Sequence, residues 1–190
     1  MSHVIDPRKN WALAEKRLIE ESDPRRRQIL ETLIAHSKAE AKPDFDALMA
    51  TVAPNAKYVS YTGGEGAKAN SPDGKAAVGE YYSMIVGSGM NHIEHNVERM
   101  AVGRDTLTTE GDMKMAYPGA VLKVMGIDVP DESALYLYED RLIIVWEFDS
   151  DGLVVCEDSY SGGDRQRFQR IAERPVRLDQ IYLWAEDPAS

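Results

Sequence analysis

Two histidines near the middle of the chain are the first candidates for proton transfer. His92 and His95 lie three residues apart in a segment expected to be a strand, so their side chains should point to opposite faces. Histidine titrates near neutral pH, and either imidazole could carry a proton to or from a substrate. The alternative is a histidine satisfied by its neighbours or placed at a dimer face. The pair is not expected to bind a metal ion, because this spacing does not bring two strand side chains to one ion.

Acidic side chains supply the second half of a possible acid–base pair. Glu157 and Asp158 are adjacent in an apolar stretch, so in a strand they face opposite ways. A carboxyl enclosed by apolar and aromatic groups such as Trp146 would lose solvation, which raises its pKa toward the range useful for acid or base chemistry. The alternatives are solvation at a sheet edge or a salt bridge with Arg141 or Arg165.

Aromatic side chains could hold an oxygenated ring. Tyr58 and Tyr61 lie in a short expected strand, and Tyr81 lies in the helix that follows. Phenol rings form an apolar wall and carry a hydroxyl that can bind a substrate oxygen, so these tyrosines and Trp146 are candidate substrate-binding residues. The alternative is that they only pack the helix against the sheet. Lys68 lies in the intervening loop, which could close over a pocket, or it is simply solvated.

Helices are predicted over the first third of the chain. Asp6-Pro7 and Asp23-Pro24 each combine a capping side chain with proline at the first helical position. Pro43-Asp44 should open a third, short helix that ends at Pro54-Asn55. Arg25 to Arg27 lies mostly off the apolar stripe of the second helix and should be solvated. That stripe consists of Ile29, Leu30, Leu33 and Ile34.

The rest of the chain is predicted to be mainly strands. A strand at 57–61 and a helix at 75–86 come first, and Gly87 to Gly89 ends the helix. Five strand segments follow, at 92–102, 106–117, 134–138, 141–149 and 153–160, with a longer excursion at 118–133. Helices followed by an antiparallel meander predict an α+β fold. The apolar segment 178–184 should pack on its own domain or on a partner subunit.

The composition excludes several classes of protein. The 190 residues suit one domain, which we expect to span 1–190. A net charge of -10 repels phosphate backbones and anionic lipids, so neither nucleic acid nor a membrane is an expected partner. Cys156 is the only cysteine, which excludes an intramolecular disulfide. Without an apolar signal stretch, a cytoplasmic location is expected.

The order of these elements, with three short motifs, resembles the nuclear transport factor 2-like superfamily and most closely its SnoaL-like polyketide cyclase branch. The motifs are Phe45-Asp46-Ala47-Leu48 before Ala56-Lys57-Tyr58-Val59, the strand segment 91–97, and the hairpin 146–154. The resemblance covers about 28–160. It implies a cone-shaped, strongly curved and mostly antiparallel sheet wrapped around N-terminal helices, a cystatin-like α+β barrel. The first helix and an extension at about 164–190 would be additions.

The same resemblance orders the candidate residues. It favours His92 on the concave side of the sheet. Ser159 occupies the position of the cyclase acid/base aspartate, and Glu157, two residues earlier on the same strand face, is the substitute. The position of the ketosteroid isomerase base holds Tyr58 and Ser60 and no carboxylate, which disfavours a simple steroid isomerase.

The expected function is a cofactor-independent acid/base lyase acting on an oxygenated aromatic or polycyclic compound. The chain is also similar to the diarylpropane lyases of lignin breakdown, which makes a lignin-derived diarylpropane the preferred substrate. The alternatives are a SnoaL-like cyclase, isomerase or dehydratase, and a non-catalytic module that binds a small molecule or a protein. No metal or cofactor is expected.

A homodimer is also expected, because the convex face of such sheets is commonly apolar. Its candidate surface is formed by Leu142, Ile144, Trp146 and Phe148. Burial of the same residues inside the cone is the competing explanation.

Overall fold

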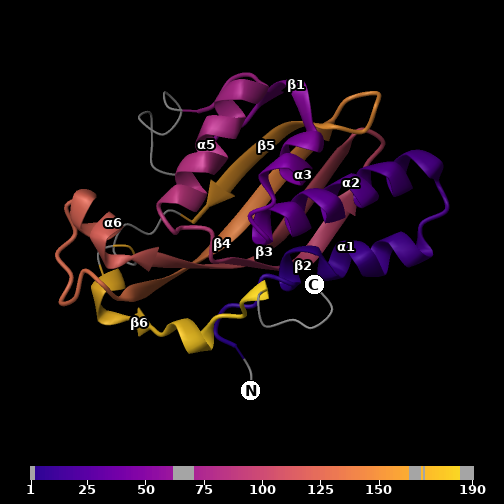
Figure 1. Ribbon diagram of the computed structural model, residues 1–190. Helices are drawn as coiled ribbons and strands as arrows, with labels where there is room; N and C mark the ends of the chain where they lie inside the picture. Colours follow the sequence, from indigo (N-terminus) through magenta and orange to yellow (C-terminus); the bar gives the residue numbers. More distant parts are fainter. Residues whose placement is uncertain (1–2, 62–70, 163–167, 169, 185–190) are drawn as a thin grey trace.

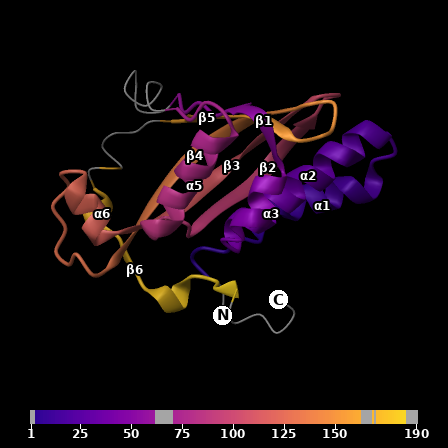
Figure 2. The ribbon, with the colours of Figure 1, turned by 45° about the horizontal axis from the view of Figure 1, so that its top comes forward.

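In the computed structural model, which describes residues 3–61, 71–162, 168 and 170–184, a curved and open sheet carries helices on one face (Figures 1 and 2). The strand order is β1-β5-β4-β3-β2, and β6 pairs with β4 outside this path. Only β1 and β5 are parallel; the other named pairs are antiparallel. The expected α+β class with a strongly curved, mostly antiparallel sheet is confirmed.

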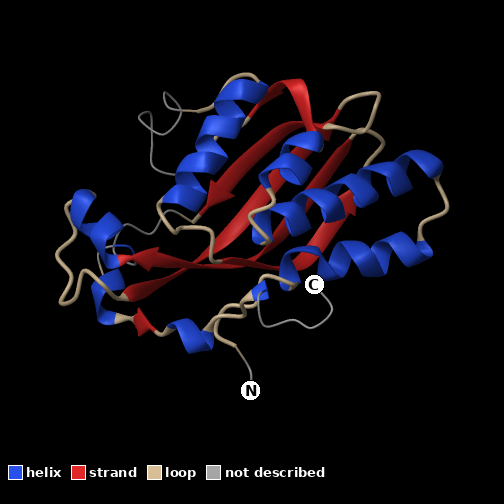
Figure 3. Ribbon diagram, in the orientation of Figure 1, coloured by secondary structure: helices blue, strands red, loops and turns tan. Residues whose placement is uncertain are grey.

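The described helices and strands follow one another along the chain as labelled in Figure 1, and Figure 3 distinguishes them by colour. The helices are α1 (Lys9–Glu20), α2 (Pro24–Ala41), α3 (Phe45–Ala50), α5 (Lys75–Gly87) and α6 (Gly119–Val124). The strands are β1 (Val52–Lys57), β2 (Ile93–Val102), β3 (Thr106–Pro118), β4 (Leu135–Phe148), β5 (Val154–Ser161) and β6 (Pro175–Val176). Short 3-10 turns at Ile171–Glu173 and Leu178–Gln180 complete the set.

The core lies between the helices and the face of the sheet that they cover, here called the inner face. Ile144, Trp146 and Phe148 alternate along β4 toward this face and are at most 8% exposed. They belong to one apolar cluster with Leu33 of α2 and Tyr82 of α5. The expected dimer surface of Leu142, Ile144, Trp146 and Phe148 is therefore wrong, because burial inside the cone removes these residues from the outside.

One of the two predicted N-caps is present, and the third helix, expected to start at Pro43-Asp44, also has one. Asp23 accepts a hydrogen bond from the Arg26 backbone N–H at 2.9 Å, and Asp44 accepts one from Ala47 at 3.1 Å. Asp6 does not cap α1, because the Arg8 guanidinium binds its carboxylate through two contacts of 2.8 Å. The first helix accordingly begins two residues later than the sequence suggests, at Lys9.

The first strand begins earlier than predicted. It spans Val52–Lys57 instead of 57–61, and Pro54-Asn55 lies within it instead of ending a helix. Proline is tolerated here because β1 is the last strand in the order of the sheet and β5 is its neighbouring strand. The chain beyond it still follows β5, through an isolated bridge between Ser60 and Ser159.

The break expected at Glu139-Asp140 is absent, and β4 runs without interruption from Leu135 to Phe148. Asp140 stays in register opposite Met113. Its carboxylate accepts from the Tyr138 hydroxyl at 2.9 Å and from the Arg141 backbone at 2.8 Å. A polar side chain that is satisfied within the strand does not require a turn.

The C-terminal segment packs on its own domain. Val176 and Ile181 are buried together with Ile5 and with sheet residues of β3 and β4. The Trp184 ring stacks on Trp11 of α1, with centroids 5.5 Å apart and an angle of 19°. Of the two alternatives for this segment, packing within the chain is the one observed.

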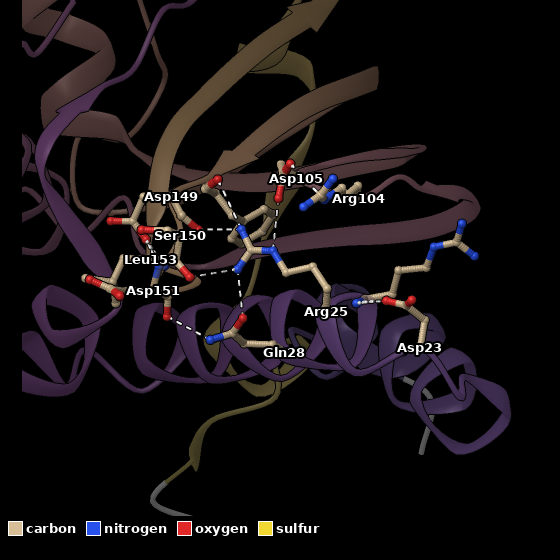
Figure 4. Close-up of polar contacts among 11 residues, drawn as sticks. Asp23, Arg25, Gln28, Arg104, Asp105, Asp149, Ser150, Asp151 and Leu153 are labelled. Carbon is tan, nitrogen blue, oxygen red and sulfur yellow. Dashed lines mark hydrogen bonds and ion pairs between the residues drawn. The ribbon is translucent and has the colours of Figure 1, made fainter.

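Two of the three arginines at the start of α2 are not solvated as expected. Arg25 reaches the turn between β4 and β5, where it donates to the carbonyl oxygens of Phe148 and Asp149 and to Asp105 Oδ1 (Figure 4). Gln28 adds a hydrogen bond of 2.9 Å to the Asp151 carbonyl in the same turn. These contacts hold α2 against one end of the sheet.

The other two arginines of the run behave differently from each other. Arg27 donates to the last carbonyls of α1, Leu18 O at 2.8 Å and Glu21 O at 2.9 Å. Arg26 remains half exposed, and its contact with Glu21 is 3.9 Å long.

In the part of the chain that the structure describes, no helix is long and apolar enough to cross a bilayer.

Replacing Arg25 by methionine should lower the free energy of unfolding by about 2 kcal/mol, because several carbonyls lose a charged donor. Arg26→Met is the matched control in the same helix and should change it by less than about 0.5 kcal/mol. Urea unfolding of both variants measures the difference. Equal effects would show that the Arg25 contacts do not stabilise the fold.

Candidate functional site

A buried chain of hydrogen bonds ends at Glu157. The Tyr82 hydroxyl lies 2.9 Å from Glu157 Oε2 and 2.9 Å from His36 Nε2. His36 Nδ1 lies 2.7 Å from Thr51 Oγ1, and the Thr51 hydroxyl donates to Leu48 O at 2.6 Å. Residues from α2, α3, α5 and β5 thus form one continuous polar path through the core.

Simple periodicities place these side chains. Glu157 is in register with Trp146, so it points to the inner face. On α2, His36 and Glu40 continue the stripe of Ile29 and Leu33 at spacings of three and four residues. The face of α2 that packs against the sheet is therefore apolar near the start of the helix and polar near its end.

Burial sets the protonation of the two ends of the path. The His36 side chain is fully buried, and this loss of solvation lowers its pKa to about 4. Burial also raises the pKa of Glu157 to about 8, and the nearby charge of Glu40 acts in the same direction. Near pH 7 the favoured pair is a neutral imidazole and a protonated carboxyl.

A hollow of about 250 Å³ opens beside Glu157, and we call it the tyrosine hollow. Its lining residues are Tyr58, Val59, Ser60, Ser71, Pro72, Tyr81, Met84, Glu157 and Ser159. The Tyr58 hydroxyl is buried and has no hydrogen-bond partner among the residues that the structure describes. It could therefore bind an oxygen atom of a substrate. A carboxyl, phenols and apolar atoms face one another in this space.

A second hollow of about 320 Å³, here called the helix hollow, lies on the other flank of α5. Glu40, Phe45, Leu48, Tyr82 and Ile85 contribute to its lining, which is mainly apolar. Burial raises the pKa of Glu40 to about 7. The hydrogen bond between Tyr82 and Glu157 joins the walls of the two hollows.

His92 and His95 do not reach Glu157 through any hydrogen bond found in the described residues, and neither lines the two hollows. His95 is opposite Met113, which is opposite Asp140 of β4, so His95 lies on the same face as Ile144 and Trp146, the inner face. His92 precedes the strand, and its expected place on the concave side stays a prediction. Burial lowers the pKa of His95 to about 4. Its Nε2 is buried without a hydrogen-bond partner among those residues.

The remaining candidates are dispersed. Asp158 points away from Glu157, and its Oδ1 accepts from the Val59 backbone at 3.0 Å. Tyr61 is 39% exposed and stacks on Tyr160 at 4.5 Å, outside the tyrosine hollow. Tyr81 lines that hollow. Lys68 and Arg165 lie outside the described residues.

Two further candidates hold structural positions. Trp146 packs its ring edge against His36 at 5.5 Å and donates to Thr109 Oγ1 at 3.2 Å. Arg141 binds Glu98, Glu110 and Asp112 instead of Glu157 or Asp158.

His36, Thr51 and Glu40 are the site residues that the sequence analysis missed. The helical spacing of His36 and Glu40 from Leu33 was the available signal. A histidine and a glutamate on the apolar stripe of a helix must be buried, and buried ionisable groups mark candidate sites.

The fold and the hollow define an open cone with an ionisable interior. A family model for the SnoaL-like domain matches residues 33–157, so the chain belongs to the SnoaL-like family, within the nuclear transport factor 2-like proteins. The match leaves out residues 1–32, which include α1 and the first half of α2, and the residues after Glu157 of β5. Among the curated proteins compared with the chain, none matches.

Solved structures share the fold at low sequence identity. A candidate SnoaL-like polyketide cyclase from Shewanella putrefaciens CN-32 superposes with a TM-score of 0.62 at 11% identity, covering 91% of this chain and 97% of that one. A second candidate cyclase, from Shewanella denitrificans OS-217, gives 0.60 at 12% identity, with 76% and 96% covered. Mycobacterium tuberculosis RV0760c, in complex with estradiol-17beta-hemisuccinate, gives 0.54 at 12% identity, with 82% and 98% covered.

The raised pKa of Glu157 predicts a pH-dependent stability. The folded protein holds this proton up to about pH 8, whereas the unfolded chain releases it near its ordinary value of 4.5, so stability falls as pH rises between these values. Glu157→Gln should therefore raise the Tm relative to wild type by about 5 °C more at pH 8 than at pH 5.

Thermal unfolding across this pH range measures the effect. Glu147→Gln is the control, because Glu147 is exposed on the opposite face of the neighbouring strand. A Tm difference for Glu157→Gln that does not change with pH would contradict the raised pKa.

Proposed function

We propose that this SnoaL-like protein is a cofactor-independent acid/base enzyme for a ring-containing, oxygenated small molecule, with Glu157 as its proton donor. The main support for this proposal is that the Glu157 carboxyl, which can be protonated at neutral pH, lies in the wall of the tyrosine hollow together with the phenols of Tyr58 and Tyr81. A carboxyl with a pKa near 8 is protonated at neutral pH and can donate to a substrate oxygen.

The preferred reaction is an elimination. Glu157 would protonate a benzylic hydroxyl, the C–O bond would break with loss of water, and a phenol ring of the substrate would delocalise the cation that forms. The carboxylate left on Glu157 would then take one proton in either of two ways. Removal of a C–H proton next to the cation gives an alkene, whereas removal of the O–H proton of a hydroxymethyl group breaks the C–C bond to that group, which gives an alkene and releases formaldehyde. A lignin-derived diarylpropane fits this chemistry, and the Tyr58 hydroxyl and Tyr81 ring would bind its oxygenated ring.

Family membership supports a second reaction class. In a SnoaL-like cyclase or isomerase, the same carboxyl would protonate a carbonyl oxygen while a carbon–carbon bond forms or a double bond shifts. The candidate cyclases from Shewanella share the fold, and RV0760c shows that a protein of this fold accommodates a steroid-like ligand. Both reaction classes depend on the same acid, so one set of variants tests both.

Glu157→Gln should lower kcat/KM at least about 100-fold on any substrate found in a panel of diarylpropanes and polyketide-like phenols. Glu147→Gln, exposed on the outer face of β4, is the control and should keep wild-type turnover. In the wild type, kcat/KM should fall above about pH 8 as Glu157 loses its proton.

The assay separates an enzyme from a binding module. Saturable binding of a panel compound without product formation would identify a carrier and refute the proposal. Turnover that survives in Glu157→Gln would refute the role of Glu157.

We also propose a homodimer formed by the outer face of the sheet. Ile143, Tyr160 and the stacked Tyr61 are each at least 37% exposed and adjoin there. Tyr160→Glu should convert the dimer to a monomer in light scattering, whereas Val124→Glu, exposed on α6, should not. A monomeric wild type would end this proposal.

A further inference from the structure

The atom that carries each proton in the path from Leu48 to Glu157 can be assigned by starting at the Leu48 carbonyl, the inner end of the path. A carbonyl can only accept, so the single hydroxyl proton of Thr51 belongs to Leu48 O, 2.6 Å away. The contact between Thr51 Oγ1 and His36 Nδ1 then requires a proton on Nδ1. In neutral His36, Nε2 is consequently a lone pair, and it faces the Tyr82 hydroxyl.

Tyr82 lies between two groups that compete for its one proton. If it donates to His36 Nε2, the Glu157 carboxyl has to bring its own proton and donate to the Tyr82 oxygen. If it donates to an ionised Glu157, the buried lone pair of His36 loses its donor. The Tyr82 hydroxyl can therefore form hydrogen bonds with both His36 and Glu157 in only two states. Either the Glu157 carboxyl is protonated, or His36 carries a proton on each ring nitrogen.

The surroundings of His36 select between these two states. Its side chain has no exposed surface, and the rings of Trp146 and Tyr82 pack against it at 5.5 and 5.9 Å. A charged imidazolium in this place would be poorly solvated. The neutral state, with the proton on Glu157, is the one that the packing favours.

We propose that His36 is a positioning residue that keeps Glu157 protonated by occupying the single proton of Tyr82. Glu157 is thereby held as an acid and not as a base. This role rests on the proposed function, because it concerns the same carboxyl. The titration that tests it requires no substrate.

Other groups face Glu157 and influence its titration. Glu40 of α2 and Asp158 of β5 raise the pKa of Glu157 through their negative charge. Tyr58, Tyr81 and Cys156 are neutral near pH 8, because burial raises their pKa values. All of these groups are retained in the variants below.

His36→Phe keeps a ring between Trp146 and Tyr82 but removes the acceptor. The Tyr82 proton is then available to an ionised Glu157, and the titration midpoint of Glu157 should fall by about one pH unit. Carboxyl NMR of glutamate-labelled protein measures this midpoint, with Glu157→Gln identifying the signal.

Thr51→Val tests the same idea from a residue that does not touch Glu157. Without the Thr51 hydroxyl, the His36 proton can move to Nε2 and point at Tyr82, so the midpoint of Glu157 should again fall. Thr51→Ser retains the hydroxyl and should leave the midpoint unchanged. This pair keeps the test available if His36→Phe does not fold.

Tyr82→Phe distinguishes the proposed competition from simple loosening of the core. It removes the shared hydroxyl, so the midpoint should not fall, whereas entry of water would lower it in every variant. An unchanged midpoint in His36→Phe and Thr51→Val, or an equal fall in Tyr82→Phe, overturns the proposal. Turnover that survives in Glu157→Gln while the midpoints shift as expected would refute the proposed function and leave this inference standing.

Discussion

The requirement that buried polar atoms be hydrogen bonded governs the centre of this protein. The path from Leu48 through Thr51, His36 and Tyr82 to Glu157 lies in an otherwise apolar core, where an unpaired donor or acceptor is costly. Its inner end is a helix carbonyl that cannot change its role. The direction of the whole path, and with it the state of Glu157, therefore depends on a backbone atom of α3.

The fold makes this arrangement possible by bringing two layers together. The inner face of the sheet contributes Glu157, and α2 and α5 contribute His36 and Tyr82. Arg25 holds one end of α2 against the β4–β5 turn, where Gly152 adopts a φ of 82° and a Cβ would approach the Gln28 side chain to 2.8 Å. The position of the path thus depends on contacts at a distant end of the same helix.

Electrostatics adds to the effect of hydrogen bonding. Glu40 and Glu157 lie on the two flanks of α5, and each is buried enough for its pKa to rise. Two like charges in one apolar region oppose each other, so ionisation of either makes ionisation of the other less favourable. A chain with a net charge of -10 thereby retains one acid, Glu157, mainly uncharged in its interior near neutral pH.

The sequence by itself determined the α+β class, the helix starts at Asp23 and Asp44, the long strands β2 and β3, and the opposite orientations of Glu157 and Asp158, but not which of these two acids points inward. These features follow from local rules, because capping and strand alternation depend on near neighbours along the chain. The edge position of β1, the uninterrupted β4 and the burial of Ile144, Trp146 and Phe148 were decided by the tertiary structure. The tertiary structure also decided that Tyr82 is the hydrogen-bond partner of Glu157. His92 and His95 stood out by residue type, but only packing brings His36 to Tyr82, 46 residues away in sequence, and a single sequence does not reveal which distant helix faces which strand.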